Sequence, residues 1–513
     1  MQRAAIRFRA SASVTRPAAT YVARAARPGV APFDTMRTCL CGVGAFGAAS
    51  SRRTPYPASV SSSRASIATQ AVNARDVVDV LKERGLLDAC TNEDELREAA
   101  ASGSLSVYCG FDPTADSLHL GNLLGIVVLA WFQRCGHTPV ALLGGATGRV
   151  GDPSGKSAER PVLDDATINA NTEGIQKILE DVLRNSAEMA AEDGVTDAKA
   201  AVVMNNLEWF GEMGFLEFLR EIGKYARVGT MMAKDSVKTR LDSEQGMSFT
   251  EFSYQLLQGY DFCHLFKTHD VRVQVGGSDQ WGNITAGTDL IRRILDKDQT
   301  EGKGAFGVTF PLLLKENGQK FGKSEDGAVW LAASRLSPYK FYQYMVQSTD
   351  ADVIRFMKML TFVPLEEIDA METAMKSDDY VPNTAQKKLA EETTRFVHGA
   401  EGLRKALKAT EGLRPGADTV LDAETLEALA EVIPTSELKL AEVLGQPVVD
   451  VMALAGLQKS KGEAKRLVKG GGARLNNVKV ESEDAVVGEA DVIEGRVMML
   501  AAGKKNKMLI KIV

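Results

Sequence analysis

Two short segments far apart in the chain hold residue types that could handle a polyphosphate. Residues 320–324 (Lys-Phe-Gly-Lys-Ser) place two ammonium groups three positions apart around a glycine. Residues 119–122 (His-Leu-Gly-Asn) follow a stretch, 108–114, that is typical of a strand, a turn and a helix start. Backbone N–H groups at a helix N-terminus attract phosphate oxygens, and a hinged loop with two lysines can clamp them from the other side. We therefore predict that a parallel sheet brings both segments to one edge.

The composition is that of a globular protein. Hydrophobic residues make up 44% and charged residues 25% of the 513 positions, and a chain of this length predicts roughly three or four domains. No run of about 18 apolar residues occurs, so we expect no membrane-spanning helix and no membrane partner. The six cysteines are scattered without two CxxC pairs, which favours unpaired thiols in a reducing compartment.

The charge is distributed unevenly along the chain. Residues 1–70 contain ten Arg, no Lys and a single acid, Asp34. Such an Arg- and Ser-rich, acid-poor segment without an apolar core is typical of an organellar transit peptide, the alternative being a disordered tail without an address. Residues 446–513 carry a net charge of +4, whereas residues 71–445 carry about −19. The basic C-terminal unit therefore indicates a polyanionic partner.

The hydrophobic pattern predicts strands that alternate with helices. We expect helices at 76–84, 118–135 and 249–262, and strands at 104–109, 138–143, 200–204 and 271–275. This alternation indicates an α/β fold with a doubly wound, Rossmann-like parallel sheet. The later parts are expected to form a charged α-helical domain and a small α+β domain. The predicted domains are a disordered segment at 1–70, a catalytic domain at 71–335, the helical domain at 336–445 and the α+β domain at 446–513.

The helix expected at residues 249–262 carries a polar stripe. Tyr254, Gln258 and Asp261 fall at positions i, i+4 and i+7, on one face of the helix. A polar stripe on an otherwise apolar helix must be satisfied by water or by a ligand.

Two glycine-rich loops are candidate nucleotide contacts. Residues 144–157 do not form a Walker A motif, because Val150 stands where the first glycine is required. A P-loop enzyme is therefore disfavoured, and the composition of this loop also fits a plain turn. Residues 274–283 follow a predicted strand, and their glycines let the backbone approach a ligand while Asp279 can accept from ribose hydroxyls.

A basic cluster precedes a triple-glycine turn near the C-terminus. Helical spacing places Lys461, Lys465, Arg466 and Lys469 close together beside residues 470–472. Such a cluster favours RNA phosphates, the alternative being a solvated helix face.

The order and the sequences of these segments resemble the signatures of class I aminoacyl-tRNA synthetases. The motif Lys-Phe-Gly-Lys-Ser resembles the form found in the tyrosyl-tRNA synthetases of bacterial and organellar type. The resemblance covers essentially everything after residue 70. It implies that L-tyrosine and ATP form tyrosyl-adenylate and pyrophosphate, and that tyrosine then passes to the 3′ end of tRNA(Tyr). It also implies an anticodon-binding helical domain, an S4-like RNA-binding domain and a homodimer with its interface around residues 211–232.

Further expectations follow from the same resemblance. Mg²⁺ would accompany ATP, with no tightly bound cofactor and no metal site of the protein's own. The precursor would be nuclear-encoded and act in the mitochondrion, the chloroplast or both.

The resemblance also implies roles for individual residues. Tyrosine would contact Tyr108, Asp112, Thr147, Asp152, Tyr254, Gln258, Asp261 and Gln280, with Tyr108 and Asp261 at its phenol. ATP would contact Gly110, Asp112, His119, Gly121, Asn122, Gly277, Asp279, Lys320, Phe321, Gly322, Lys323 and Ser324. Catalysis would rest on Thr114, His119, Lys320 and Lys323, with Lys156 and Arg160 as further basic residues on the phosphate side. RNA would contact Lys461, Lys465, Arg466, Lys469 and Arg474.

One position departs from the class signature. Asn122 stands where a second histidine often occurs, and because an amide can still donate to a ring oxygen we expect activity to be retained.

Three alternatives remain open at this stage. A tryptophanyl relative would need an indole-sized pocket, against which Tyr108 and Asp261 argue. A catalytically inactive RNA-binding factor on the same scaffold is disfavoured by intact His119, Asp279, Lys320 and Lys323. A nucleotidyltransferase acting on a small cofactor is disfavoured by the basic C-terminal unit.

Overall fold

The computed structural model describes residues 75–155, 163–242, 246–295, 300, 303–324, 327–414, 421–430, 432–503 and 506–513. All of them belong to one compact unit, residues 60–513. The segment expected to be a transit peptide, 1–70, lies outside the described residues. The four described cysteines, at 90, 109, 135 and 263, are free thiols.

A six-stranded sheet forms the centre of the N-terminal half, in the order β1–β6–β5–β2–β3–β4. All neighbours pair in parallel except β1 and β6, which are antiparallel. The chain proceeds outward from β2 through β3 to β4 and returns to β5 and β6 on the other side of β2. This is the doubly wound topology that the sequence predicts, with its switch point between β2 and β5. The strands are β1 Ala89–Cys90, β2 Ser106–Phe111, β3 Thr138–Leu143, β4 Val202–Asn205, β5 Val271–Gly277 and β6 Phe306–Phe310.

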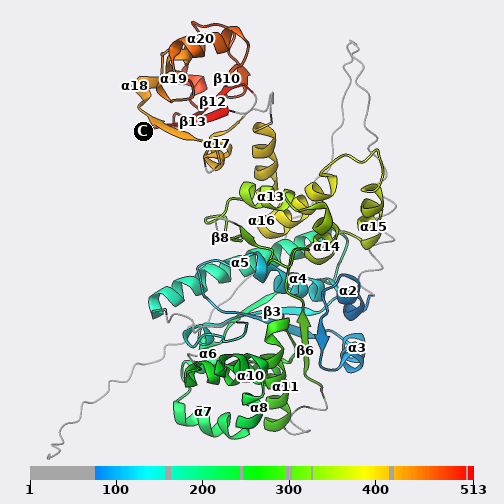
Figure 1. Ribbon diagram of the computed structural model, residues 1–513. Helices are drawn as coiled ribbons and strands as arrows, with labels where there is room; N and C mark the ends of the chain where they lie inside the picture. The colour runs from blue at the N-terminus through cyan, green and yellow to red at the C-terminus, as the bar shows by residue number, and fades with distance from the viewer. Residues whose placement is uncertain are drawn as a thin grey trace, which may run out of the picture. The chain divides into compact units, whose positions relative to one another are not determined.

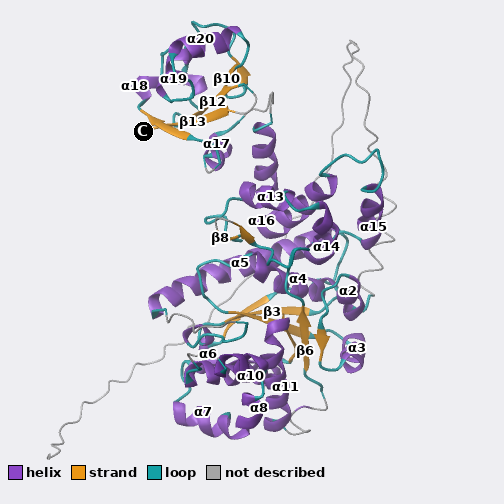
Figure 2. Ribbon diagram, viewed as in Figure 1, coloured by secondary structure: helices purple, strands orange, loops and turns teal. Residues whose placement is uncertain are grey.

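Helices cover both faces of this sheet (Figure 1). On one face α4 packs on β2, whose alternate residues Val107, Cys109 and Phe111 belong to the hydrophobic core, and α5 packs on β3 and β4. On the other face α10 and α11 pack around Tyr108 and the side chains of β3 that point the same way. Figure 2 shows the strands as a layer between helices. The helices of this half are α2 Val77–Glu83, α3 Glu93–Ser102, α4 Leu120–Arg134, α5 Asp165–Glu192, α6 Leu207–Phe210, α7 Phe215–Glu221, α8 Val228–Met232, α9 Asp235–Leu241, α10 Phe249–His269 and α11 Trp281–Ile294.

The helical region that the sequence predicts is confirmed. It consists of α13 Pro338–Val346, α14 Asp350–Leu360, α15 Leu365–Ala374 and α16 Thr384–Gly412. Helix α16 is broken at Gly399, whose φ of 71° lies in the left-handed region. There the Asn185 amide of α5 donates to the carbonyl of Phe396 at 3.1 Å, which satisfies backbone groups that the break leaves open.

The C-terminal part forms a small α+β unit with its own core. Its five-stranded sheet has the order β11–β10–β12–β13–β9, and only the β13–β9 pair is parallel. Strand β9 lies upstream of residue 446, so this sheet takes a strand from before the expected domain boundary. The elements are α17 Ala423–Leu429, β9 Thr435–Leu438, α18 Leu440–Val443, α19 Val448–Leu454, α20 Lys461–Lys469, β10 Ala473–Leu475, β11 Val478–Lys479, β12 Val497–Ala502 and β13 Asn506–Ile512.

None of the helices within the described residues is long and apolar enough to span a membrane.

Candidate active site

A cavity of about 460 Å³ opens at the carboxyl ends of β2 and β5, at the switch point of the sheet. It gathers residues from both ends of the part of the chain that contains the six-stranded sheet, as the sequence predicts. The predicted site residues that line it are Tyr108, Gly110, Asp112, Thr114, His119, Gly121, Asn122, Thr147, Asp152, Tyr254, Gln258, Asp261, Gly277, Asp279, Gln280, Lys320, Phe321 and Gly322.

Four predicted residues cannot be placed in the cavity from the structure. Lys156 and Arg160 lie outside the described residues. Lys323 and Ser324 form the short strand β7, which pairs with β8 (Gly327–Ala328), but their side chains are outside the described part of the structure.

The buried end of the cavity holds a carboxylate with two fixed donors. Asp261, on α10, is only 2% exposed. Its oxygens accept hydrogen bonds from Trp209 Nε1 at 2.9 Å and from Asn206 Nδ2 at 3.1 Å. Burial raises the pKa of Asp261 to about 8, because the loss of hydration outweighs the two hydrogen bonds that favour the anion.

The hydroxyl group of Tyr108 lines the same cavity. Tyr108 is 1% exposed, and its hydroxyl has no hydrogen-bond partner within the described residues. Burial and then the charge of Asp261 raise the pKa of Tyr108 well above its usual range. A buried hydroxyl without a partner is costly, so a ligand hydroxyl that accepts from Tyr108 and donates to Asp261 would satisfy both groups.

A second carboxylate lies nearer the middle of the cavity. Asp112, which follows β2, accepts from Thr147 Oγ1 at 2.7 Å and from Tyr254 Oη at 2.8 Å. Burial, followed by the charge of Asp112, raises the pKa of Tyr254 well above its usual range, so Tyr254 remains a donor.

A third carboxylate, Asp152, belongs to the loop that failed the Walker A pattern. Gln280 Nε2 donates to it at 2.7 Å, and Asn283 Nδ2 donates to it at 3.3 Å and to Ser154 Oγ at 3.1 Å. This network joins the loop to the segment after β5. With the carboxylates of Asp112 and Asp152 in one cavity, the field favours a cationic group such as an ammonium.

The other end of the cavity joins residues 119–122 to residues 320–322, the two segments that the sequence predicts to lie at one edge of the sheet. Leu120 N donates to Val329 O at 2.8 Å, and Val329 N donates to Gly322 O at 2.9 Å. Gly322 has a φ of 97°, and a Cβ at this position would lie 3.0 Å from Leu120 Cβ. Glycine is therefore required for the loop to lie directly against the first turn of α4.

His119 and Asn122 shape the beginning of α4. His119 is the N-cap residue, and Asn122 Oδ1 accepts from the His119 backbone N–H at 3.1 Å. The first turn of α4 therefore faces the cavity with a capped N-terminus, which attracts anions. Because the Asn122 side-chain oxygen accepts this hydrogen bond, the amide N–H₂ group of Asn122 is the part that can donate to a ligand, as the sequence predicts.

Sequence reasoning missed the roles of several polar residues. Asn206 and Trp209 hold Asp261, and the only local signal was an amide directly after a predicted strand. Gln274, in the middle of β5, is 2% exposed, lines the cavity and has a side-chain oxygen without a partner within the described residues. Asn283 was noticed only as part of the glycine-rich segment.

The basic cluster of the C-terminal unit is exposed, and part of it is already paired. Lys461 contacts Asp450 at 2.9 Å, and Lys469 contacts Glu483 at 3.0 Å. Exposed pairs of this kind contribute little and exchange readily for other anions. Lys465 and Arg466 are exposed on α20, whereas Arg474, on β10, donates to the carbonyl of Asn477 at 2.8 Å.

Among the described residues, no group of three His, Cys, Asp or Glu side chains could hold a metal ion.

Comparison with known proteins identifies the relatives of this chain. Residues 100–413 match the family model described as tRNA synthetases class I (W and Y), and residues 425–510 match a tyrosine–tRNA ligase C-terminal domain. The chain is 58% identical over 446 residues to the chloroplastic/mitochondrial tyrosine–tRNA ligase of Arabidopsis thaliana, covering 86% of this chain and 85% of that protein. It is 55% identical to tyrosine–tRNA ligase of Protochlamydia amoebophila, covering 85% and 99% of the two chains.

A solved structure agrees with these relatives. A C-terminally truncated mitochondrial tyrosyl-tRNA synthetase of Aspergillus nidulans superimposes with a TM-score of 0.59 at 32% identity, covering 66% of this chain and 98% of that one.

The raised pKa of Asp261 predicts a pH-dependent stability. The pKa is 3.8 in a model peptide and about 8 in the folded protein, so between these values the folded state binds more protons than the unfolded state. The stabilising contribution is full below about pH 4, declines as pH rises and is lost above about pH 8. Thermal unfolding of the wild type and of Asp261→Asn, which cannot titrate, should show the wild type losing stability relative to the variant between about pH 5 and pH 8. A difference that does not change with pH would contradict the assignment.

Proposed function

Because the chain belongs to the class I tRNA synthetases (W and Y) and is a tyrosine–tRNA ligase, we propose that its tyrosine and ATP meet in the cavity at the switch point of the sheet. The enzyme uses ATP to activate tyrosine and then charges tRNA(Tyr). The observation that carries the proposal is the buried Tyr108 hydroxyl without a partner beside Asp261.

We assign the buried end to the phenol of tyrosine. The phenol would accept from Tyr108 and donate to Asp261, whose position is fixed by Asn206 and Trp209. The ammonium group would lie toward the other carboxylates, with Asp152, Tyr254, Gln258 and Gln280 around it. Asp112 and Thr147 would orient this set, because Asp112 accepts from both Thr147 and Tyr254.

We assign the other end to ATP. Asp279 and Gly277 would contact the ribose, while Gly110, Gly121 and Asn122 would line the nucleotide. The γ-phosphate side would meet Thr114 and His119 at the start of α4, and Mg²⁺ would enter with ATP on its phosphate oxygens. The tyrosine carboxylate oxygen attacks the α-phosphorus, the bond to the bridging oxygen breaks, and pyrophosphate leaves. This step needs no protein nucleophile, so positioning and charge stabilisation dominate.

The later parts of the chain would recognise tRNA. We propose that the helical region of residues 336–445 binds the anticodon region. We propose that the C-terminal α+β unit is an S4-like RNA-binding domain that uses Lys461, Lys465, Arg466, Lys469 and Arg474.

We propose that residues 1–70 direct the precursor to the mitochondrion, the chloroplast or both. Their acid-poor composition supports this, and the Arabidopsis relative bears a chloroplastic/mitochondrial name. A fluorescent reporter that carries these residues should enter an organelle, and a reporter that stays in the cytosol would contradict the proposal.

An exposed apolar surface supports a homodimer. Phe215, Leu216, Leu219, Val228 and Met232, here called the α7–α8 patch, are between 41% and 79% exposed. Apolar residues gathered in this way mark an interaction surface, and the patch falls within the range expected for the dimer interface. Helix α6, which carries Trp209, immediately precedes α7. Dimerisation would therefore also support the segment that holds Asp261.

Leu216→Asp should convert the dimer into a monomer, because a carboxylate would be buried in an apolar interface. Sedimentation velocity gives the mass, and pyrophosphate exchange should be largely lost with the dimer. Val381→Asp, at a valine outside the patch that is 65% exposed, against 79% for Leu216, is the control and should remain a dimer. A Leu216→Asp protein that stays dimeric would show that the α7–α8 patch is not the interface.

Lys320→Ala and Lys323→Ala should each lower the rate of tyrosyl-adenylate formation far more than they weaken tyrosine binding. Both ammonium groups are proposed to act on charge that develops on the leaving pyrophosphate, so the loss should be in the transition state, on the order of 100-fold. ATP–pyrophosphate exchange measures the rate, and equilibrium dialysis measures the tyrosine affinity. Equal losses in the two quantities would assign the lysines to ground-state binding or folding.

Removal of the C-terminal unit should separate the two half-reactions. Helix α17 packs on β12 and β13, and β9 completes the sheet, so the truncation belongs after Arg414. Adenylate formation should remain nearly intact, whereas tRNA charging should fall strongly. Lys465→Glu with Arg466→Glu should reproduce part of this loss, and the defect should deepen as salt rises, because salt screens the phosphate contacts that remain. Loss of both half-reactions would mean that the unit stabilises the catalytic half.

A further inference from the structure

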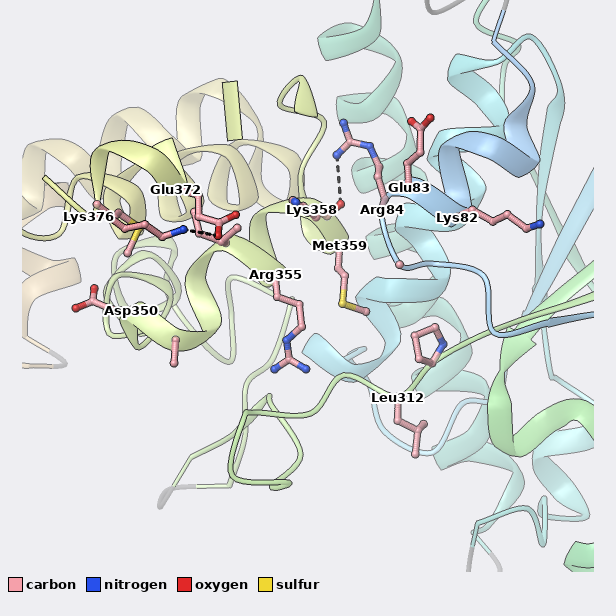
Figure 3. A pocket seen from close by; sticks show the side chains of 15 residues that line it. Lys82, Glu83, Arg84, Leu312, Asp350, Arg355, Lys358, Met359, Glu372 and Lys376 are labelled. Atoms are coloured by element: carbon pink, nitrogen blue, oxygen red, sulfur yellow. Dashed lines mark hydrogen bonds and ion pairs between the residues drawn. The ribbon is translucent and has the colours of Figure 1, made fainter. Parts of the chain in front are cut away.

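A second hollow lies behind one wall of the active-site cavity. It has a volume of about 750 Å³, and Pro311 and Leu312 line both it and the cavity. Its opposite wall includes α14, as Figure 3 shows with Arg355, Lys358 and Met359. The segment that leads from β6 to Lys320 therefore runs between the ATP end of the cavity and α14.

The hollow itself is a poor anion site, because the five cations that line it already have partners. Lys82 contacts Glu93, Lys358 contacts Asp369 and Lys376 contacts Glu372. Arg84 donates to three backbone carbonyls, and Arg355 contacts Asp352. Helices α13 and α14 instead make specific contacts with residues 314–322, the segment in front of the hollow.

An ion pair of α14 binds two points of this segment. Asp352 is 3% exposed and accepts from the backbone N–H of Glu316 at 2.9 Å and from Arg355 Nη2 at 2.6 Å. Arg355 Nη2 also donates to the carbonyl of Leu314 at 2.5 Å. Leu314 in turn pairs with Lys320 in an isolated antiparallel bridge. The Asp352–Arg355 ion pair therefore fixes Leu314, the residue that forms the bridge with Lys320.

A tyrosine of α13 binds the other side of Lys320. Phe321 is buried, and its ring centroid lies 5.2 Å from that of Tyr344 and 4.1 Å from that of Phe356. The backbone N–H of Gly322 donates to Tyr344 Oη at 3.0 Å. Gly322 is also the residue that lies against Leu120. The hydroxyl of Tyr344 thus holds the loop at its point of contact with α4.

We propose that Tyr344 and Asp352 are positioning residues for adenylate formation. Neither side chain lines the active-site cavity. They hold residues 314–322 from the helical region, so that Lys320 is already placed at the phosphate end when charge develops on pyrophosphate. Preorganisation of this kind removes the cost of ordering a loop during the reaction. The inference rests on the proposed role of Lys320.

Tyr344→Phe tests the proposal, because it removes the hydroxyl and keeps the ring that packs on Phe321. In ATP–pyrophosphate exchange we expect kcat to fall about 3- to 10-fold, the factor that corresponds to one net hydrogen bond, with an unchanged KM for tyrosine. Tyr342→Phe is the matched control, since Tyr342 lies on the same helix and is buried in the hydrophobic core, whereas Tyr344 is half-buried and contacts Phe321 and Gly322. It should keep the wild-type kcat.

The double variant Tyr344→Phe, Lys320→Ala separates positioning from general structure. Once the ammonium group of Lys320 is absent, only the placement of Lys323 can still be disturbed, so Tyr344→Phe should cause a clearly smaller loss of kcat in this background. The same fold-loss in both backgrounds, or a rise in the KM for tyrosine that matches the fall in kcat, would overturn the proposal. If Lys320→Ala alone leaves the rate unchanged, the proposed role of Lys320 fails. If Lys320→Ala slows exchange and Tyr344→Phe does not, only the positioning role fails.

Discussion

The buried carboxylate of Asp261 is the constraint on which the rest of the site depends. A charge placed in an apolar interior is unfavourable unless fixed donors surround it. Two fixed donors therefore converge on it, Asn206 directly after β4 and Trp209 from α6, while the hydroxyl of Tyr108 on β2 lines the same cavity without a partner among the described residues. The parallel sheet makes this convergence possible, because its carboxyl ends deliver all these segments to one edge. A ligand with a hydroxyl group completes the arrangement.

The opposite end of the cavity depends on backbone contacts. Two hydrogen bonds through Val329 join Gly322 to Leu120, so the lysine loop and the start of α4 form one unit. Side chains of the helical region then hold the same loop through Tyr344 and Asp352. Polar and charged side chains therefore shape one end of the cavity, and backbone hydrogen bonds shape the other. This arrangement suits a reaction that depends mainly on positioning two substrates.

Local patterns were sufficient for much of the fold. The continuous apolar run at 138–143 was predicted with the bounds that β3 has, and the helix expected at 118–135 is observed as α4, Leu120–Arg134. The pattern was insufficient where an element exists only through its neighbours. Strand β1 has two residues and forms because β6 pairs with it, and β9 joins its sheet through β13. The break at Gly399 depends on Asn185, more than 200 positions earlier.

The same distinction holds for the site. The residues proposed to touch ligands directly lie in recognisable motifs, and the structure gathers those whose side chains it describes in one cavity. The residues that orient them do so only through tertiary contacts, which no local pattern encodes. Trp209, Asn206, Tyr344 and Asp352 all belong to this second group.

The most direct test of the account is the preference for tyrosine over phenylalanine in ATP–pyrophosphate exchange, measured for the wild type and for Tyr108→Phe. The substitution removes one buried hydroxyl and leaves the size of the cavity nearly unchanged. Because a lost partner for a buried polar group costs about 1–3 kcal/mol, the ratio of kcat/KM for tyrosine to that for phenylalanine should fall about 5- to 150-fold. A variant that discriminates like the wild type would show that the phenol does not bind between Tyr108 and Asp261.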